Sequence, residues 1–321
     1  MNPQFVRSIS RHGVLLALIA LVLFGWARYD NFLGAFNVLS VLRYNAMFAL
    51  VALGMAYVIM TGGIDLSVGS TAALGSVVAA LLSPYGAVPG LLGGVAAGLF
   101  IGAVNALVIT RLNILPFIAT LATMLAASGL ALLLAGNQSV SVSYETGFVE
   151  LGQGDLLGFP IPAWIAAFAY ILGSIALNLT AWGRTVLAVG GNEEATRLMG
   201  LSGDRAKASV YLISGGLAGL AGVILAAQFG AGQPIEGVGW ELFAIASVVV
   251  GGTLLTGGVG SVGATLAGVM LLGLIFNILN FENGLGWISL SAYWQSVIRG
   301  AFLLLVVVIQ ARLVAKTEEA A

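Results

Sequence analysis

The sequence predicts an all-α integral membrane protein with about ten transmembrane helices and glycine-rich breaks in its central region. Hydrophobic residues make up 60% of the 321 residues and charged residues only 8%, where a soluble domain carries roughly 25% charged residues. The mean hydropathy of +1.05 agrees. A water-soluble domain of this length would need roughly three times more charge, so the composition indicates that lipid surrounds the chain.

The apolar runs are expected to form a single transmembrane domain over residues 1–321. The first run, 14–27, follows two arginines and is expected to be a signal anchor, because no small-residue cleavage site follows it. Further spans are expected near residues 41–60, 66–83, 88–110, 114–136, 161–180, 208–229, 241–256, 260–280 and 292–311.

Glycine is unusually frequent, with 45 residues, about twice its usual share of roughly 7%. Helices in lipid associate through small residues that let their backbones approach closely. Small residues recur every fourth position at Gly90, Gly94, Gly98 and Gly102, and again at Gly260, Ala264 and Gly268. The spacing therefore predicts tightly packed helix pairs rather than a chemical site.

Basic residues predict the orientation in the membrane, since they concentrate on the cytoplasmic side. With the N-terminus inside, nine of the twelve basic residues fall on that side, and both termini are expected to be cytoplasmic. These nine are Arg7, Arg11, Arg111, Arg184, Arg197, Arg205, Lys207, Arg312 and Lys316. The acidic residues expected outside are Asp30, Glu145, Glu150, Asp155, Glu236 and Glu282.

Two polar segments are not expected to span the membrane. Residues 137–160 are acidic and external, and form either a plain connector or a docking surface for an external partner. Residues 181–208 are cytoplasmic and carry seven charges. Within them Asn192 is a good N-cap and Gly200 a natural stop, which predicts a short helix. Such a helix needs a surface to pack on, either a cytoplasmic partner or the membrane itself.

The first glycine-rich break is Thr61-Gly-Gly-Ile-Asp-Leu-Ser-Val-Gly-Ser70. An aspartate inside the membrane costs about 2.5–3.5 kcal/mol, and an N-cap recovers only about 1 kcal/mol. Two interpretations remain open. Asp65 or Ser67 caps the next helix, or the segment is a broken helix that lines a translocation path.

The second break, residues 250–263, has a similar glycine pattern and a similar expected depth. The likeness indicates either an internal duplication or a coincidence of glycine-rich sequence. Gly258–Gly263 also matches the G-x-G-x-x-G pattern of dinucleotide-binding folds. Its flanks are apolar all round, which argues against a soluble cofactor-binding sheet. Arg299 is expected either to reach the outer interface or to pair with an acidic group in the bundle.

Several chemistries are excluded or unsupported. With no cysteine, the chain forms no disulfide, and no catalytic or metal site is expected. The single histidine, His12, lies beside Arg7 and Arg11 and is expected to flank the first span. The only lysines are Lys207 and Lys316, and neither follows a glycine in a G-x-x-x-x-G-K-[ST] phosphate loop. The net charge of −1 gives no reason to expect nucleic acid as a partner.

Three motifs resemble permease subunits of bacterial ATP-binding-cassette importers of the ribose/xylose/arabinose/galactose group. They are Gly62-Gly-Ile-Asp-Leu-Ser-Val-Gly-Ser70, the run from Gly183 to Gly200, and Ala246-Ser-Val-Val-Val-Gly-Gly-Thr253. The resemblance covers roughly residues 14–312. Related permeases for branched-chain amino acids have Asn-Leu-Ala where this chain has Asp65-Leu66-Ser67, which favours sugar. Residues 282–290 resemble galactofuranose importers.

The resemblance implies a type II-like permease fold in the bacterial inner membrane with broken central helices. It also implies a dimer with a second copy or a paralogous permease, cytoplasmic ATPases that hold the ATP, and a periplasmic sugar-binding protein. The chain itself would bind no cofactor. The coupling helix to the ATPase would comprise Gly191, Asn192, Glu193, Glu194, Ala195, Arg197, Leu198, Met199 and Gly200. The translocation path would include Gly62, Gly63, Asp65, Ser67, Gly251, Gly252 and Thr253.

Two other functions have less support in the sequence. An ion-coupled secondary transporter would use Asp65 as its coupling carboxylate, although such proteins usually need more buried ionisable groups. A membrane-embedded enzyme lacks clustered carboxylates or a histidine pair within the spans. The sequence does not identify the sugar, because the Asn, Gln, Ser, Thr and aromatic residues that bind hydroxyl groups are scattered over several helices.

Overall fold

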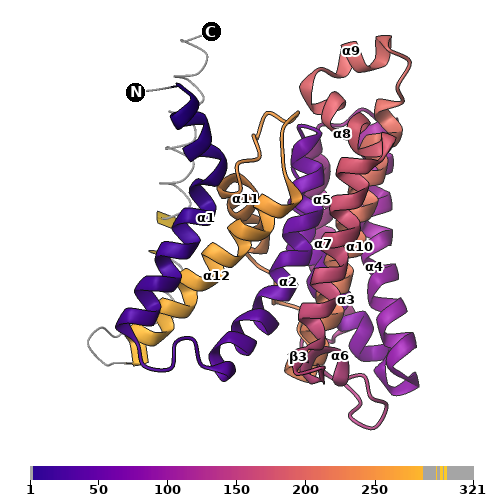
Figure 1. Cartoon of the computed structure of the whole chain (residues 1–321). Helices are drawn as coiled ribbons and strands as arrows, with labels where there is room; N and C mark the ends of the chain where they lie inside the picture. The colour runs from indigo at the N-terminus through magenta and orange to yellow at the C-terminus, as the bar shows by residue number, and fades with distance from the viewer. Residues whose placement is uncertain (1–2, 285–293, 295–296, 299, 302–321) are drawn as a thin grey trace.

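The computed structural model describes the backbone of residues 3–284, 294, 297–298 and 300–301, and side chains from residue 13 onward within those ranges. Long helices run side by side between two ends of the molecule (Figure 1). One end carries the short helix α9 (Glu193–Leu198), and we name it the α9 end. The opposite end carries α6 (Glu150–Gln153), and we name it the α6 end.

Seven helices of the described residues are long and apolar enough to cross a membrane, judged by length and composition. They agree in position with seven of the expected spans. They are α2 (Ala35–Met60), α3 (Val68–Leu82) with its continuation η1 (Ser83–Tyr85), α4 (Ala87–Arg111), α5 (Pro116–Leu134), α7 (Ile161–Leu179), α10 (Gly203–Phe229) and α12 (Val262–Gly284).

Two apolar helices are shorter in the described residues. The apolar part of α1 (Pro3–Arg28) begins at Gly13. Helix α11 (Trp240–Val250) ends six residues before the expected span does. Its 11 residues rise about 16 Å, whereas the hydrocarbon core is about 30 Å thick. The expectation that this segment spans the membrane as one helix is therefore wrong. The expected span at 292–311 lies largely outside the described residues, as does Arg299.

The segment 137–160 folds against the α6 end. Strand β1 (Val140–Ser141) pairs antiparallel with β4 (Ala231–Gly232), and β2 (Asp155–Leu156) pairs with β3 (Phe159–Pro160). Between them Phe148 is fully buried in a cluster with side chains of α3 and α10. The segment is therefore a fixed cover on the bundle as well as a connector.

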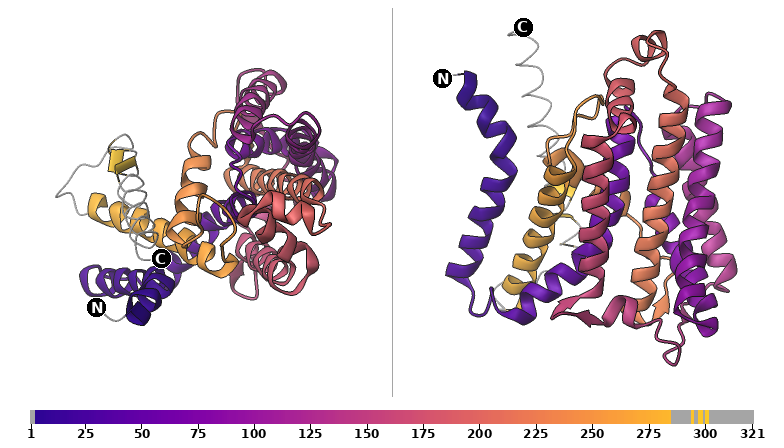
Figure 2. Two further views of the ribbon diagram at one scale, coloured as in Figure 1. Left: turned by 90° about the horizontal axis from the view of Figure 1, so that it is seen from above. Right: turned by 45° about the vertical axis from the view of Figure 1, so that its right-hand side comes forward.

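The central helices pack through glycine, as their spacing predicts. Helix α10 runs along α4 and α3 in the middle of the bundle (Figure 2). A Cβ atom on Gly219 of α10 would lie 2.6 Å from the carbonyl oxygen of Gly94 and 3.0 Å from the Cα of Gly98. Gly102 and Gly215 meet in the same way. No side chain fits between these backbones, which confirms that the four-residue spacing serves close helix packing.

Helix α1 lies against α12 at the side of the bundle (Figure 2). The contact is aromatic near the α6 end, where the ring centroids of Tyr29 and Phe281 are 5.1 Å apart. The Tyr29 hydroxyl donates a hydrogen bond to Glu282 Oε1 at 2.6 Å. Arg28 also lies 3.6 Å from this carboxylate. These contacts hold the ends of α1 and α12 together.

Candidate functional site

Helix α9 follows α8 (Ala181–Gly191) and stands out from the bundle as a separately capped unit. The Asn192 side chain accepts a hydrogen bond from the Ala195 N–H at 2.8 Å, which makes it the predicted N-cap. At the other end Gly200 has a φ of +77°. The N–H groups of Gly200 and Leu201 donate to the carbonyls of Arg197 and Thr196, which is a Schellman motif. The predicted short helix is present with both predicted ends.

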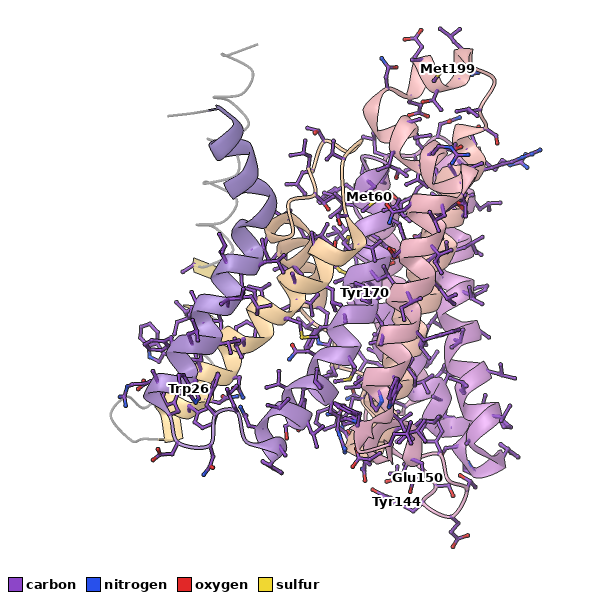
Figure 3. All side chains as sticks on the ribbon, viewed as in Figure 1. Trp26, Met60, Tyr144, Glu150, Tyr170 and Met199 are labelled. Atoms are coloured by element: carbon purple, nitrogen blue, oxygen red, sulfur yellow. The ribbon has the colours of Figure 1, made fainter. Side chains whose placement is uncertain are left out.

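The exposed surface of α9 carries two apolar side chains among its charged ones. Leu198 is 84% exposed and Met199 66% exposed, and Met199 lies at the tip of the molecule in Figure 3. The inner face is attached to the bundle, since Thr196 is buried. Lys207 at the start of α10 forms an ion pair with Glu193 at 2.6 Å. The helix is thus held at a fixed place while presenting two unpaired apolar side chains.

The two glycine-rich breaks form the same turn. After α2, the N–H groups of Gly62 and Gly63 donate to Ile59 O and Val58 O. After α11, those of Gly252 and Thr253 donate to Val249 O and Val248 O. Both are Schellman motifs, with a φ of +80° at Gly62 and +85° at Gly252. We call residues 61–67 the first glycine turn and residues 251–261 the second glycine turn.

Asp65 of the first glycine turn is buried within a hydrogen-bonded network. Its Oδ1 accepts bonds from the backbone N–H (3.0 Å) and the hydroxyl (2.6 Å) of Ser67. Its Oδ2 accepts a bond from the Ser214 hydroxyl of α10 at 2.8 Å. Asn105 of α4 donates to Ser67 Oγ at 2.9 Å, and Thr123 of α5 donates to Asn105 Oδ1 at 2.6 Å. The network therefore ties the first turn to three neighbouring helices.

This geometry overturns the capping interpretation. Ser67 occupies the N-cap position of α3, yet its side chain makes no capping hydrogen bond. Its hydroxyl donates to Asp65 instead, and Asp65 bonds the N–H of the N-cap residue rather than one inside the helix. Asp65 does not line the cavity between α2, α11 and α12 that is described below. Asp65 thus holds the turn through tertiary contacts.

The two glycine turns meet at the end of α8. A Cβ atom on Gly190 would collide with the carbonyl oxygen of Met60. One on Gly257 would lie 3.0 Å from the Cα of Gly190 and 2.7 Å from the backbone nitrogen of Gly62. The Gly258 N–H donates to Met60 O at 3.0 Å. We call Met60, Gly62, Gly190, Gly257 and Gly258 the glycine junction; Figure 3 labels Met60 within it.

Sequence reasoning missed several members of this site. Gly190 appears in the sequence analysis only within the run from Gly183 to Gly200, and Asn105, Thr123 and Ser214 are not named there. The signal in the sequence is that each of these three polar residues lies inside an apolar span. A polar residue there is unusual enough to indicate that it has a buried hydrogen-bond partner. Tyr211 of α10 was missed as well. Its buried hydroxyl has no hydrogen-bond partner among the described residues and lies against Gly63.

Comparison with known proteins gives a consistent result over nearly the whole chain. The family described as "Branched-chain amino acid transport system / permease component" matches residues 37–307. The ribose import permease protein of Bacillus subtilis (strain 168) is 38% identical over 300 residues, covering 92% of this chain and 91% of that protein. The L-arabinose transport system permease protein of Escherichia coli (strain K12) is 35% identical, covering 95% and 92%.

A second ribose import permease protein, from Escherichia coli (strain K12), is 37% identical and covers 92% of both chains. No solved structure matches the chain. The family description names amino acids, whereas these relatives are named for sugars, in agreement with the Asp65-Leu66-Ser67 sequence in the first glycine turn. Both the extent and the level of identity show that the chain belongs to this family of transport-system permease components.

Proposed function

We propose that this chain is the permease subunit of an ATP-driven sugar importer of the bacterial inner membrane. The observation that carries the proposal is α9, a short helix capped at both ends whose apolar side chains Leu198 and Met199 face outward. The relatives named as ribose and arabinose permeases support a sugar as the substrate. ATP would be held by a separate cytoplasmic subunit, and this chain would bind no cofactor.

The distribution of charge supports an orientation with both termini in the cytoplasm. Arg111, Arg184, Arg197 and Lys207 belong to segments at the α9 end. At the α6 end Arg43 is paired with Asp155 at 2.6 Å, which offsets its charge. Positive charge therefore gathers at the α9 end, as expected for the cytoplasmic side of a membrane protein. The segment 137–160 would then face the periplasm.

The residues Gly191–Gly200 would be the coupling helix, seated on the cytoplasmic ATPase. When the ATPase subunits close, α9 and α8 would move together, because α8 leads directly into α9. The glycine junction would pass that movement to both glycine turns, since Gly190 contacts Met60, the last residue before the first turn, and Gly257 of the second turn contacts both Gly190 and Gly62. Such contacts leave no soft side chain to absorb a displacement.

The two glycine turns would form the inner part of the translocation path. Gly62, Gly63, Gly251, Gly252 and Thr253 would contribute backbone, which is tolerated at membrane depth where it lines a cavity. Asp65 and Ser67 would hold the first turn in place. Helix α11 and the second turn together would form a broken span, so that about ten spans complete the type II-like permease fold.

Partners would be a cytoplasmic ATP-binding-cassette ATPase, a periplasmic sugar-binding protein and a second permease, either a copy or a paralogue. The ion-coupled alternative has no observation in its favour. Three hydrogen bonds stabilise the Asp65 carboxylate where it lies, and a coupling group would need room for its ion.

The proposal is tested by purifying the tagged chain from its native membrane in mild detergent and identifying what accompanies it. We expect a stoichiometric ATPase and a second permease copy or paralogue. Glu194→Arg and deletion of residues 192–199 should abolish uptake and release the ATPase while the chain stays folded. Asp30→Arg, an exposed charge reversal at the α6 end, is the matched control. Normal uptake by the Glu194 variant and the deletion would contradict the coupling role.

A further inference from the structure

A cavity of about 560 Å³ opens between α2, α11 and α12, away from the glycine junction. Its rim includes Glu236 and Val238, which lie in the loop that precedes α11 near the α6 end. On the proposed orientation it therefore opens toward the periplasmic side. Its size falls within the range of about 300–1,000 Å³ typical of small-molecule sites.

One wall of this cavity is aromatic. Phe48 of α2 packs on Trp240 with a centroid distance of 4.8 Å and on Phe243 with 4.6 Å. Phe276 of α12 continues the row at 5.9 Å from Phe243. Three helices thus supply one continuous surface of rings, and all four residues line the cavity. An aromatic face suits a flat ligand with a C–H-rich side.

The same cavity carries amide side chains from two helices. Asn45 lies one helical turn before Phe48, donates to Val41 O at 2.8 Å, and is held against Gly273 of α12. Asn277 exchanges hydrogen bonds with Asn37 at 2.8 and 3.2 Å. An amide both donates and accepts hydrogen bonds, as does a sugar hydroxyl. Rings and amides that line one cavity match the C–H-rich and the hydroxyl-bearing parts of a monosaccharide.

From these observations we infer that the cavity between α2, α11 and α12 is a binding site for a monosaccharide on its way through the protein. The inference deepens the proposed function and rests on it. It selects Phe48, Trp240, Phe243, Asn45 and Asn277 from the many residues that could meet hydroxyl groups. Neither glycine turn contributes a lining residue.

The position of the cavity connects it to the α9 end. Helix α2 bears Phe48 and ends at Met60 of the glycine junction, while α11 bears Trp240 and Phe243 and ends at the second glycine turn. Both walls of the site therefore end where the turns meet α8. A displacement of α8 would change the distance between α2 and α11 across the cavity, and hence the affinity for the sugar.

The test uses the complete importer in its native cells, with ATP-dependent uptake measured for a panel of radiolabelled pentoses and hexoses. If the wild type transports none of them, the proposed function itself fails. For the best sugar, Phe48→Ala and Trp240→Ala should lower maximal uptake at least tenfold. Stimulation of ATPase activity by the loaded sugar-binding protein should persist, because the coupling helix is untouched.

Two variants guard against a merely structural effect. Phe48→Tyr keeps the ring and should restore uptake. Phe36→Ala removes an 86% exposed phenylalanine from the same helix, outside the cavity, and should transport normally. The inference is overturned if Phe48→Ala transports at the wild-type rate. It is also overturned if uptake and ATPase stimulation fall together in Phe48→Ala and Phe48→Tyr alike.

A second measurement uses the absence of cysteine from the chain. Val238→Cys places a thiol at the rim of the cavity, and Ile235→Cys places one three residues away, outside it; both positions are exposed. The transported sugar should slow labelling of Cys-substituted position 238 by a membrane-impermeant maleimide in the working importer. A non-transported sugar should not. Equal labelling rates with both sugars would indicate that the cavity holds lipid or another protein surface instead.

Discussion

The two glycine turns have the same backbone geometry and differ in what holds them. The first contains a buried carboxylate bonded to Ser67 and Ser214, and the network continues to α4 and α5. By the alignment of Gly62 with Gly252, the counterpart of Asp65 is Leu255, which is 36% exposed. The second turn contacts the glycine junction through its backbone. The first turn thus contains a buried carboxylate network, and at the corresponding position the second turn has a leucine.

This difference suggests how a permease can be rigid and movable at once. A polar network is costly to disturb, because each buried donor left without a partner costs about 1–3 kcal/mol. Closely packed glycine backbones form few directional bonds. The segments that they join can therefore slide past their neighbours as a unit. The first turn is therefore suited to fix α2 and α3, and the second to shift with α8.

The largest expected effect is at the anchored turn. Asp65→Ala removes the acceptor of three hydrogen bonds and should lower the free energy of unfolding by about 3 kcal/mol or more. Leu255→Ala, the matched change in the second turn, should cost below about 1 kcal/mol. Thermal unfolding in detergent measures both. Equal losses would show that the side-chain network does not distinguish the turns.

A smaller effect is expected at the junction. Gly190→Ala introduces a methyl group that collides with Met60 O, and the backbone shift should cost about 1–3 kcal/mol. Gly129→Ala in α5 is the control, since a Cβ atom there meets nothing within 4 Å. We expect uptake per ATP hydrolysed to fall in the first variant and to be unchanged in the second. A fall of the same size in both would argue against transmission through the junction.

The two turns share a left-handed backbone conformation, and this can be tested by substitutions that strain the backbone without creating a clash. Gly62→Ala and Gly252→Ala force alanine into the left-handed region, at about 1–2 kcal/mol each. Neither methyl group meets an atom closer than 3.4 Å. The melting temperatures should therefore fall by similar amounts. Gly263→Ala, in α12 with open space around it, should stabilise the chain slightly.

The smallest effect is expected at the ion pair of α9. Lys207→Gln breaks the pair with Glu193, whose side chain is 53% exposed, so the loss of stability should be about 0–1 kcal/mol and should diminish in high salt. Binding of the copurified ATPase is the more sensitive readout. A loosened α9 would no longer hold Leu198 and Met199 in a fixed position for the ATPase to contact. Unchanged ATPase binding at low salt would show that the caps alone position the helix.

Local features of the chain could be predicted because their causes are local. Asn192 and Gly200 bound α9 as expected, since a cap depends only on residues three or four positions away. The small residues of α4 face α10 because their spacing places them on one side of a helix. Helix α11 was predicted too long, since the apolar sequence continues through Thr253 and Leu254 after the Schellman motif has ended the helix.

By itself the sequence determined that the chain lies in a membrane, where most of its helices run, how α9 begins and ends, and which family it resembles. Only the tertiary structure decided that Asp65 bonds Ser214, 149 positions away, that Gly190 meets Met60 and the second glycine turn, and that Phe48 and Trp240 share one wall. The physical reason is range. Hydropathy, caps and helical spacing act over a few residues, whereas these pairings depend on which helices lie side by side, and helices in lipid offer many nearly equivalent apolar faces.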